Sequence, residues 1–185
     1  GSDALSAAVI NGIFEGLIRI DNGKIVPGMA ESWEVSEDGL TYTFHIREDA
    51  KWWDGEKLTA QDFVYGLIRL VDPNPPAPNG QYAFQGFYIE NAEKFYNQEI
   101  TDPSKVGVKA LDEHTLEITL EDPVPYFLGL MDFCGFYPCR EDYIDEHGME
   151  YASDVGKIMG NGPFVLKSWN HEQTLELEKN PNYWN

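Results

Sequence analysis

The clearest alternation of hydrophobic and polar residues in this chain lies between residues 41 and 47. Tyr42, Phe44 and Ile46 alternate there with threonine, histidine and arginine. This period of two is typical of a β-strand with one buried face. A turn cluster at residues 36–39 comes just before it. We therefore predict a strand over 41–47 that contributes one face to a core.

A helical pattern follows the tryptophan pair at residues 52–53. Thr59 stands in the position of an N-cap, and Asp62 lies three residues later, where a capping-box acid suits the positive end of the helix dipole. Apolar residues then recur at helical spacing, at Phe63, Leu67, Leu70 and Val71. The pattern predicts a helix after Thr59 with a buried apolar stripe.

Shorter elements are predicted on both sides of this stretch. Residues 6–18 have the pattern of a helix, or of a helix followed by a strand. Residues 105–110 and 115–120 are predicted to form a hairpin, because apolar and polar residues alternate in the second segment. Residues 125–130 and 141–147 have the pattern of two helices.

The last part of the chain is predicted to be mostly extended. Residues 133–139 are predicted to be extended. Residues 164–169 and 174–178 alternate as strands, with Leu175 and Leu177 facing inward. Together these elements indicate an α+β fold, with a mixed, mainly antiparallel sheet and flanking helices.

A proline-rich loop separates the predicted helix from the most aromatic part of the chain. Four prolines between residues 73 and 78 exclude the interior of a helix or a strand. Tyr82 and Phe84 follow this loop directly. Their pattern fits either packing in the core or a place at the border of a cleft, and the sequence leaves both open.

The charge balance narrows the possible partners. The chain has 13 Lys+Arg and 32 Asp+Glu, a formal net charge of −19. Such a surface repels nucleic-acid phosphates and anionic lipid headgroups, so we expect no nucleic-acid partner. Solubility of a secreted protein explains this acidity more simply than cation binding does. No run of 18 apolar residues occurs, so no membrane-spanning helix is predicted.

The sequence carries none of the common catalytic or metal-binding patterns. GxSxG, HExxH, CxxC and Walker motifs are absent, and the four histidines are scattered. Residues 160–163 resemble the start of a nucleotide-binding loop, but the spacing fails and Pro163 removes an N–H that a phosphate would need. Carboxylates are numerous, and counting them leaves a glycosidase-like pair open. We predict binding without catalysis, metal or cofactor.

Two cysteines, Cys134 and Cys139, lie in the segment CGFYPC. In a fully extended chain they would be about 16 Å apart, well beyond the roughly 7 Å limit between the Cα atoms of a disulfide. Gly135 and Pro138 could fold the segment back. Two buried thiols are nevertheless favoured over a bridge.

Five segments, in the same order and with similar spacing, resemble the family 5 extracellular solute-binding proteins, the oligopeptide- and dipeptide-binding receptors of ABC importers. They are IFEGLIRID (13–21), FHIREDAKWWDGEKLTAQDFVYGLIRLVDP (44–73), VKALDEHTLEITLEDPVPYFLGL (108–130), GNGPFVLKSW (160–169) and LEKNPNYW (177–184). The resemblance therefore extends from residue 13 to the end of the sequence.

This resemblance implies a domain organisation. The chain would be the amino-terminal lobe of a type II periplasmic-binding-protein-like fold. Residues 1–20 and 161–185 would belong to the first, ligand-cleft domain, and residues 21–160 would form an inserted second domain. In the family a further lobe follows the segment NPNYW, and we expect this carboxy-terminal lobe to be absent here.

The resemblance also implies a function. Family members capture a solute outside the cytoplasm, in the periplasm or as cell-surface lipoproteins, and deliver it to ABC permease subunits in the membrane. Two lobes close on an extended peptide, whose main chain is held by hydrogen bonds while its side chains occupy wet, tolerant pockets. We expect a monomer with a peptide ligand. Because the residues that fix the peptide termini belong to the absent lobe, we expect this chain to fold but to bind peptide poorly.

The resemblance and the element pattern place seven residues at the cleft: Ser6, Ala7, Tyr82, Phe84, Phe136, Asn161 and Gly162. Ser6 and Ala7 are expected to precede the first helix, and Phe136 to lie on an extended segment. For Phe136, Asn161 and Gly162, a purely structural role in packing or turning is an equal alternative.

Several other functions fit the same sequence. Members of the same family take up nickel complexes, oligosaccharides or signalling peptides, although the segments VPYF and DPNP resemble the oligopeptide branch more closely. A second class is a secreted carbohydrate-active protein that uses exposed Trp52, Trp53 or Trp169 as sugar platforms. A third is a non-catalytic surface adhesin domain.

Overall fold

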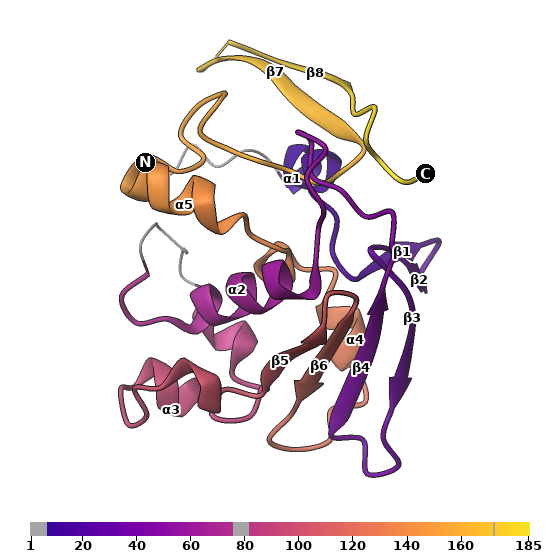
Figure 1. The fold of residues 1–185 in the computed structure, drawn as a ribbon, viewed down its shortest axis with the longest axis vertical. Helices are drawn as coiled ribbons and strands as arrows, with labels where there is room; N and C mark the ends of the chain where they lie inside the picture. Colours follow the sequence, from indigo (N-terminus) through magenta and orange to yellow (C-terminus); the bar gives the residue numbers. More distant parts are fainter. Residues whose placement is uncertain (1–6, 76–81, 172) are drawn as a thin grey trace.

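A computed structural model describes residues 7–75, 82–171 and 173–185 of the chain. Figure 1 shows a four-stranded sheet at one end of the molecule and a separate hairpin, β7–β8, at the other, with helix α1 between them. Helices α2 and α3 lie beside the four-stranded sheet, and α5 lies nearer to the β7–β8 end.

The four-stranded sheet is antiparallel throughout, with the order β3-β4-β6-β5. Its strands are β3 (Ala30–Val35), β4 (Thr41–Ile46), β6 (Thr115–Thr119) and β5 (Val108–Asp112). The prediction for β4 is confirmed, because Tyr42, Phe44 and Ile46 are buried and the residues between them are half-buried. β5 and β6 form the predicted hairpin.

Helix α2 (Ala60–Val71) covers the buried face of this sheet and confirms the predicted apolar stripe. Asp62 Oδ2 accepts a hydrogen bond from the backbone N–H of Thr59 at 2.8 Å, as the sequence predicted for an acid in the first turn. The same oxygen accepts the indole N–H of buried Trp52 at 3.2 Å. The helix start is thereby tied to the tryptophan pair that precedes it.

The segment after the proline-rich loop contains short helices. The structure has the 3₁₀ turn η1 (Ala83–Gly86), helix α3 (Ala92–Tyr96) and the 3₁₀ turn η2 (Pro103–Lys105). Phe95 is buried against the main core, whereas Phe87 and Tyr96 pair with ring centres 5.3 Å apart. The aromatic richness of this segment therefore serves both the core and the surface.

Residues 125–150 form a chain of short helical pieces. They are α4 (Phe127–Leu130), η3 (Cys134–Phe136), α5 (Glu141–His147) and η4 (Gly148–Glu150). The prediction of α5, ended by Gly148, is confirmed. The prediction of an extended segment over 133–139 is wrong, because a 3₁₀ turn occupies its first half. Cys134 and Cys139 are unbridged as expected, but Cys134 is exposed, so the prediction of two buried thiols is wrong for it.

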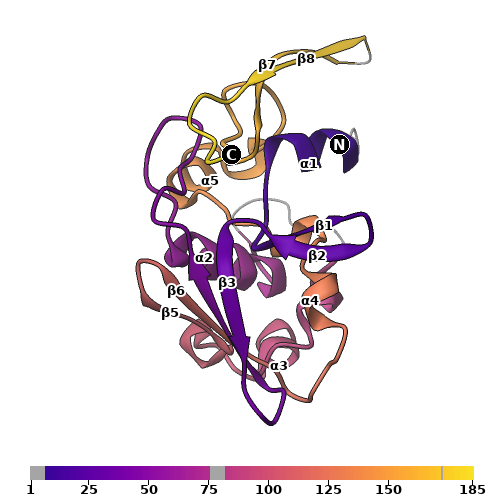
Figure 2. The ribbon, with the colours of Figure 1, turned by 90° about the vertical axis from the view of Figure 1, so that its right-hand side faces the viewer.

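Two hairpins project from the body of the molecule (Figure 2). They are β1 (Ile18–Asp21) with β2 (Lys24–Pro27), and β7 (Phe164–Asn170) with β8 (Thr174–Lys179). Leu177 in β8 lies opposite buried Leu166 and within 4 Å of the Cβ position of Gly12 in α1, so it faces inward as predicted, although 36% of its surface stays exposed. A two-stranded hairpin offers one small apolar face, and Leu177 shares it with buried Leu166 and half-buried Leu175.

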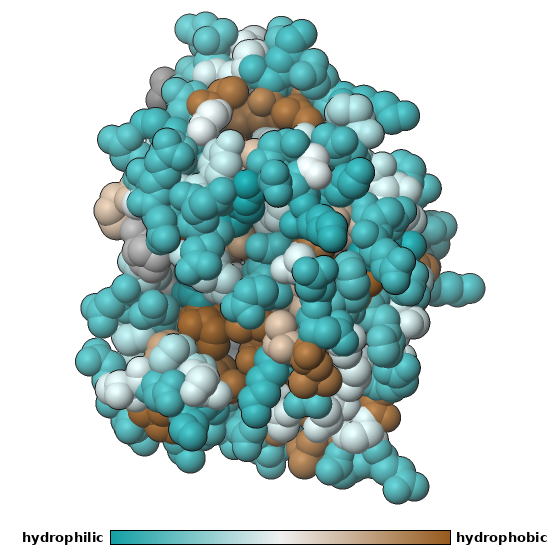
Figure 3. All heavy atoms as spheres, viewed as in Figure 1, coloured by the Kyte–Doolittle hydropathy of each residue, from teal (hydrophilic) through white to brown (hydrophobic). Residues whose placement is uncertain are grey.

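Helix α1 (Ala7–Ile13) lies under the β7–β8 hairpin and belongs to a small second core. Ile13, Ile158 and Leu166 are its buried members, separate from the larger core between α2 and the four-stranded sheet. Most of the face in Figure 3 is hydrophilic, as the acidic composition predicts, with apolar residues in separate groups. None of the helices in the described ranges has the length and apolar character of a membrane span.

Candidate functional site

An aromatic strip, which we define as Phe14, Tyr82, Phe133 and Tyr137, gathers side chains from three distant parts of the sequence. The rings of Tyr82 and Phe133 meet edge to face with centres 5.1 Å apart. The rings of Phe14 and Tyr137 lie 6.5 Å apart. Phe133 and Tyr137 flank the short turn η3, which connects these two contacts along the backbone.

Tyr82 forms the exposed end of this strip, and a second predicted cleft residue, Phe84, lies two positions further along the chain. Tyr82 is 50% exposed and Phe84 is 56% exposed. The sequence left open whether these two rings pack in the core or lie at the border of a cleft. Their exposure excludes packing in the core. Large exposed aromatic rings are suited to contact with a ligand, because they present much apolar area at low entropic cost.

Phe136 lies in a different environment. Its side chain is 1% exposed and meets Phe127 edge to face, with ring centres 6.0 Å apart. Phe136 therefore packs in the core beneath the strip, which matches its structural alternative. Ser6 lies outside the described residues. Ala7 is the first residue of α1 and does not precede the helix as expected.

Asn161 and Gly162 connect the end of α1 to the last part of the chain. Asn161 is fully buried, and its side chain pairs with the backbone of Glu15: Oδ1 accepts from the Glu15 N–H at 3.0 Å, and Nδ2 donates to the Glu15 carbonyl at 2.8 Å. The N–H groups of both residues donate to the carbonyl of Ile13, at 3.1 and 2.9 Å. A Cβ on Gly162 would lie 2.7 Å from backbone atoms of Ile13 and Phe14, so no larger residue fits.

Glu15 is a residue that the sequence reasoning did not single out. Its carboxylate is 4% exposed, and both oxygens are hydrogen-bonded: Oε1 accepts from the Tyr183 hydroxyl at 2.5 Å, and Oε2 accepts from Trp184 Nε1 at 2.6 Å. Burial raises the pKa of Glu15, although these two hydrogen bonds and the charge of Arg19 oppose the rise. The sequence feature that could have indicated a buried acid is its place between apolar residues in the segment IFEGL.

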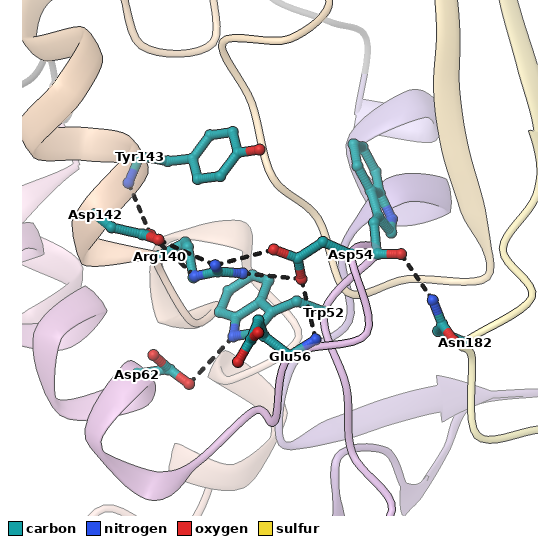
Figure 4. Close-up of polar contacts among 9 residues, drawn as sticks. Trp52, Asp54, Glu56, Asp62, Arg140, Asp142, Tyr143 and Asn182 are labelled. Carbon is teal, nitrogen blue, oxygen red and sulfur yellow. Dashed lines mark hydrogen bonds and ion pairs between the residues drawn. The ribbon is translucent and has the colours of Figure 1, made fainter.

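The loop that contains Trp52 and Trp53 is anchored to helix α5 by Arg140 (Figure 4). Its guanidinium lies 3.0 Å from Asp54 Oδ2 and 2.9 Å from Asp142 Oδ1, and its side chain is mostly buried. Burial alone would raise the pKa of Asp54, but the hydrogen bonds from Arg140 outweigh it, so the pKa is lowered. On the other side of this loop, Asn182 Nδ2 donates to the carbonyl of Trp53 at 2.8 Å. The loop is thus held both by α5 and by the last residues of the chain.

The tryptophans do not form the exposed platform that a carbohydrate-active protein would need. Trp52 is fully buried, so this expectation is wrong for it. Trp53 and Trp169 are half-buried, and the Trp169 ring packs at 4.1 Å against His171. Within the described ranges, no three His, Cys, Asp or Glu side chains gather as they would around a metal ion. A hollow of about 160 Å³ beside β5, bordered by Lys105 and Lys109, shares no residue with the strip.

Comparison with known proteins gives consistent matches. The family model described as bacterial extracellular solute-binding proteins, family 5 middle, matches residues 24–185. The periplasmic oligopeptide-binding protein OppA of Escherichia coli is 43% identical over 176 residues, which are 94% of this chain and 31% of that protein. The dipeptide-binding protein DppE of Bacillus subtilis is 40% identical over 185 residues, which are 100% of this chain and 33% of that protein.

A solved structure described as Listeria monocytogenes OppA bound to peptide superposes on this fold with a TM-score of 0.91, at 35% identity. The match covers 100% of this chain and 36% of that one. The chain therefore spans about a third of the length of the relatives it matches.

Proposed function

Because the chain belongs to family 5 of the bacterial extracellular solute-binding proteins, we propose that it is the amino-terminal third of a receptor that captures peptides outside the cytoplasm for an ABC importer. The observation that carries this proposal is identity of 40% or more, over nearly the whole chain, to proteins named as oligopeptide- and dipeptide-binding. Binding is the activity of this family, so no catalytic step is part of the proposal.

The proposed receptor divides the chain into parts of two domains. Residues 161–185 and the segment up to about residue 20 contribute to the ligand-cleft domain, and the residues between them form the second domain. Ile13 and Leu166 share a small core that is separate from the larger one, which supports the division, although Ile158 from the second domain also packs there. Leu17 and Ile18 pack in the larger core, and the β1–β2 hairpin would be cut by a boundary at residue 20, so we place the boundary just before Leu17.

The proposed ligand-facing surface is the exposed end of the aromatic strip, Tyr82, together with Phe84, while buried Tyr137 supports it from beneath. A peptide captured in an extended form is held mainly through its backbone, and exposed aromatic rings can accommodate varied side chains. Tyr82 and Phe84 have the exposure that such a contact requires. Asn161 and Gly162 support this surface through the turn at Ile13, and Ser6 and Ala7 remain proposed neighbours of the ligand. The permease subunits of the importer are the proposed protein partners.

A chimera tests this proposal directly. Residues 1–185 would replace the matched third of the Listeria monocytogenes protein, and calorimetric titration with mixed di- to penta-peptides would measure affinity. We expect about micromolar binding by the folded chimera, and binding at least about 100-fold weaker by the 185-residue chain alone. Micromolar binding by the chain alone, or none by a chimera whose fold circular dichroism confirms, would contradict the proposal.

A further inference from the structure

The fully or almost fully buried polar residues of the described chain belong to one connected network. These residues are Glu15, Asn161 and Asn180. Asn161 pairs with the backbone of Glu15, and Asn180 Nδ2 donates to the carbonyl of Gly162 at 2.8 Å. Three residues after Asn180, Tyr183 returns to the Glu15 carboxylate. The network is therefore a closed ring that passes through residues 15, 161–162 and 180–184.

The Glu15 carboxyl is the only ionisable group among these three, and hydrogen-bond donors reach both of its oxygens. Its two oxygens receive two separate donors, Tyr183 and Trp184. Arg19 Nε lies 3.5 Å from Oε1. The guanidinium of Arg47 lies 3.5 Å from the centre of the Trp184 ring, on which it stacks. Buried polar groups with every partner in place define one arrangement more sharply than apolar packing does.

The residues on both sides of Glu15 contact the same side chain of the aromatic strip. Phe14 packs against the ring of Tyr137, and a Cβ on Gly16 would lie 2.9 Å from that ring. The Tyr137 hydroxyl lies 3.1 Å from Asn11 Oδ1 and 3.0 Å from the carbonyl of Asp132. Any shift of residues 14–16 therefore moves Tyr137, and with it the turn that leads to Phe133.

We propose that Glu15 is a positioning residue: its carboxylate holds residues 13–16 against Tyr183 and Trp184, and so fixes the aromatic strip, whose exposed end faces the ligand. The ligand-facing role of the strip rests on the function proposed above, whereas the positioning itself does not. A carboxylate suits this task because Trp184 Nε1 can only donate and needs an acceptor, while the Tyr183 hydroxyl occupies the second oxygen. A glutamine would offer one acceptor where the site uses two.

Amide hydrogen exchange near pH 7 can distinguish a positioning role of Glu15 from a general contribution to stability. The measurement needs no ligand. In Glu15→Gln we expect exchange to accelerate about tenfold or more in residues 11–16, 132–137 and 180–184, while amides of β4 and β6 stay within about twofold of the parent. Amides of the central sheet exchange mainly through global unfolding, so they serve as the internal reference for any change in global stability. Glu31→Gln, on exposed strand β3, is the matched control and should change neither set.

Tyr183→Phe provides a second variant, which retains the ring and removes only one donor to Glu15. It should accelerate the same three segments, by a smaller factor, and its effect should not add fully to that of Glu15→Gln. Equal acceleration in the sheet and the three segments would overturn the proposal, because Glu15 would then act on global stability alone. Unchanged exchange in residues 132–137 in both variants would overturn it as well. Peptide binding by the chimera is measured separately, so failure of either proposal is recognised independently.

Discussion

Ionisation of Glu15 is expected to lower the free energy of unfolding as the pH rises. Burial raises its pKa in the folded protein above the ordinary value of a glutamate, against the opposing effect of Tyr183 and Trp184. A raised folded-state pKa contributes stability that is fully present below the unfolded-state pKa and is lost as pH rises through the folded-state value. The free energy of unfolding of the parent, minus that of Glu15→Gln, should therefore fall as the pH rises from about 4, the ordinary range of a glutamate, toward neutral. Urea unfolding of both proteins across this range measures the difference.

The comparison with Glu15→Gln isolates this residue from acids that respond in the opposite direction. Hydrogen bonds from Arg140 lower the pKa of Asp54, so its contribution is lost as pH falls, in both proteins alike. A difference that grows with rising pH would mean that the hydrogen bonds from Tyr183 and Trp184, and not burial, dominate the Glu15 equilibrium. Burial could then no longer explain the ionisation of this carboxylate.

Single residues differed in how far their role could be predicted. The cap formed by Thr59 and Asp62 depends on residues three positions apart, so the sequence contains all of it. The side-chain hydrogen bonds of Asn161 and Glu15 connect residues that are 146 or more positions apart, and no local pattern reveals them. Tyr82 and Phe84 were partly predictable. The aromatic segment that contains them indicated either a cleft or a core, and only the fold decides between the two.

At the scale of elements, the packing of helix α2 against the segment before α5 requires a glycine at position 66. A Cβ on Gly66 would lie 2.6 Å from the carbonyl oxygen of Tyr137 and 3.2 Å from the backbone nitrogen of Cys139. Gly66→Ala should therefore destabilise the protein by about 2 kcal/mol or more, because backbone must move apart to admit the methyl group. Denaturant unfolding measures this change.

Gly129→Ala is the matched control for that substitution. Gly129 also lies in a helix, α4, but no atom lies within 4 Å of its Cβ position. Alanine favours a helix over glycine by about 1 kcal/mol, so this variant should be unchanged or slightly more stable. Equal effects of the two substitutions would mean that α2 does not pack closely on residues 137–139.

Elements with a strong local period were predictable, and those shaped by their neighbours were not. β4, α2, the β5–β6 hairpin and α5 follow directly from spacing and turn residues. The turn η3 was missed because Gly135 packs against Phe133 and Leu70, contacts that a local pattern does not contain. Alternation predicted the side that Leu177 faces but not its 36% exposure, because the two-stranded hairpin has too little area to bury it.

At the scale of the whole molecule, the chain combines a large core, a small second core and a buried polar ring that joins them. The family and the α+β fold were recognisable from five segments of sequence, since these segments carry the turns and core positions of the fold. The aromatic strip was only partly predictable, because it brings together residues 14, 82 and 133–137 through tertiary packing. The central proposal is that the exposed end of this strip, Tyr82, faces the peptide together with Phe84.

The most direct test of this claim is the peptide affinity of the chimera after removal of the two exposed rings. Tyr82→Ala combined with Phe84→Ala should weaken binding about tenfold or more, since each ring would lose its contact area with the ligand. Tyr96→Ala, which removes a 40% exposed ring on α3 at the far end of the molecule from α1 (Figure 1), should leave the affinity unchanged. Unchanged affinity in the double variant, or an equal loss in Tyr96→Ala, would contradict the claim.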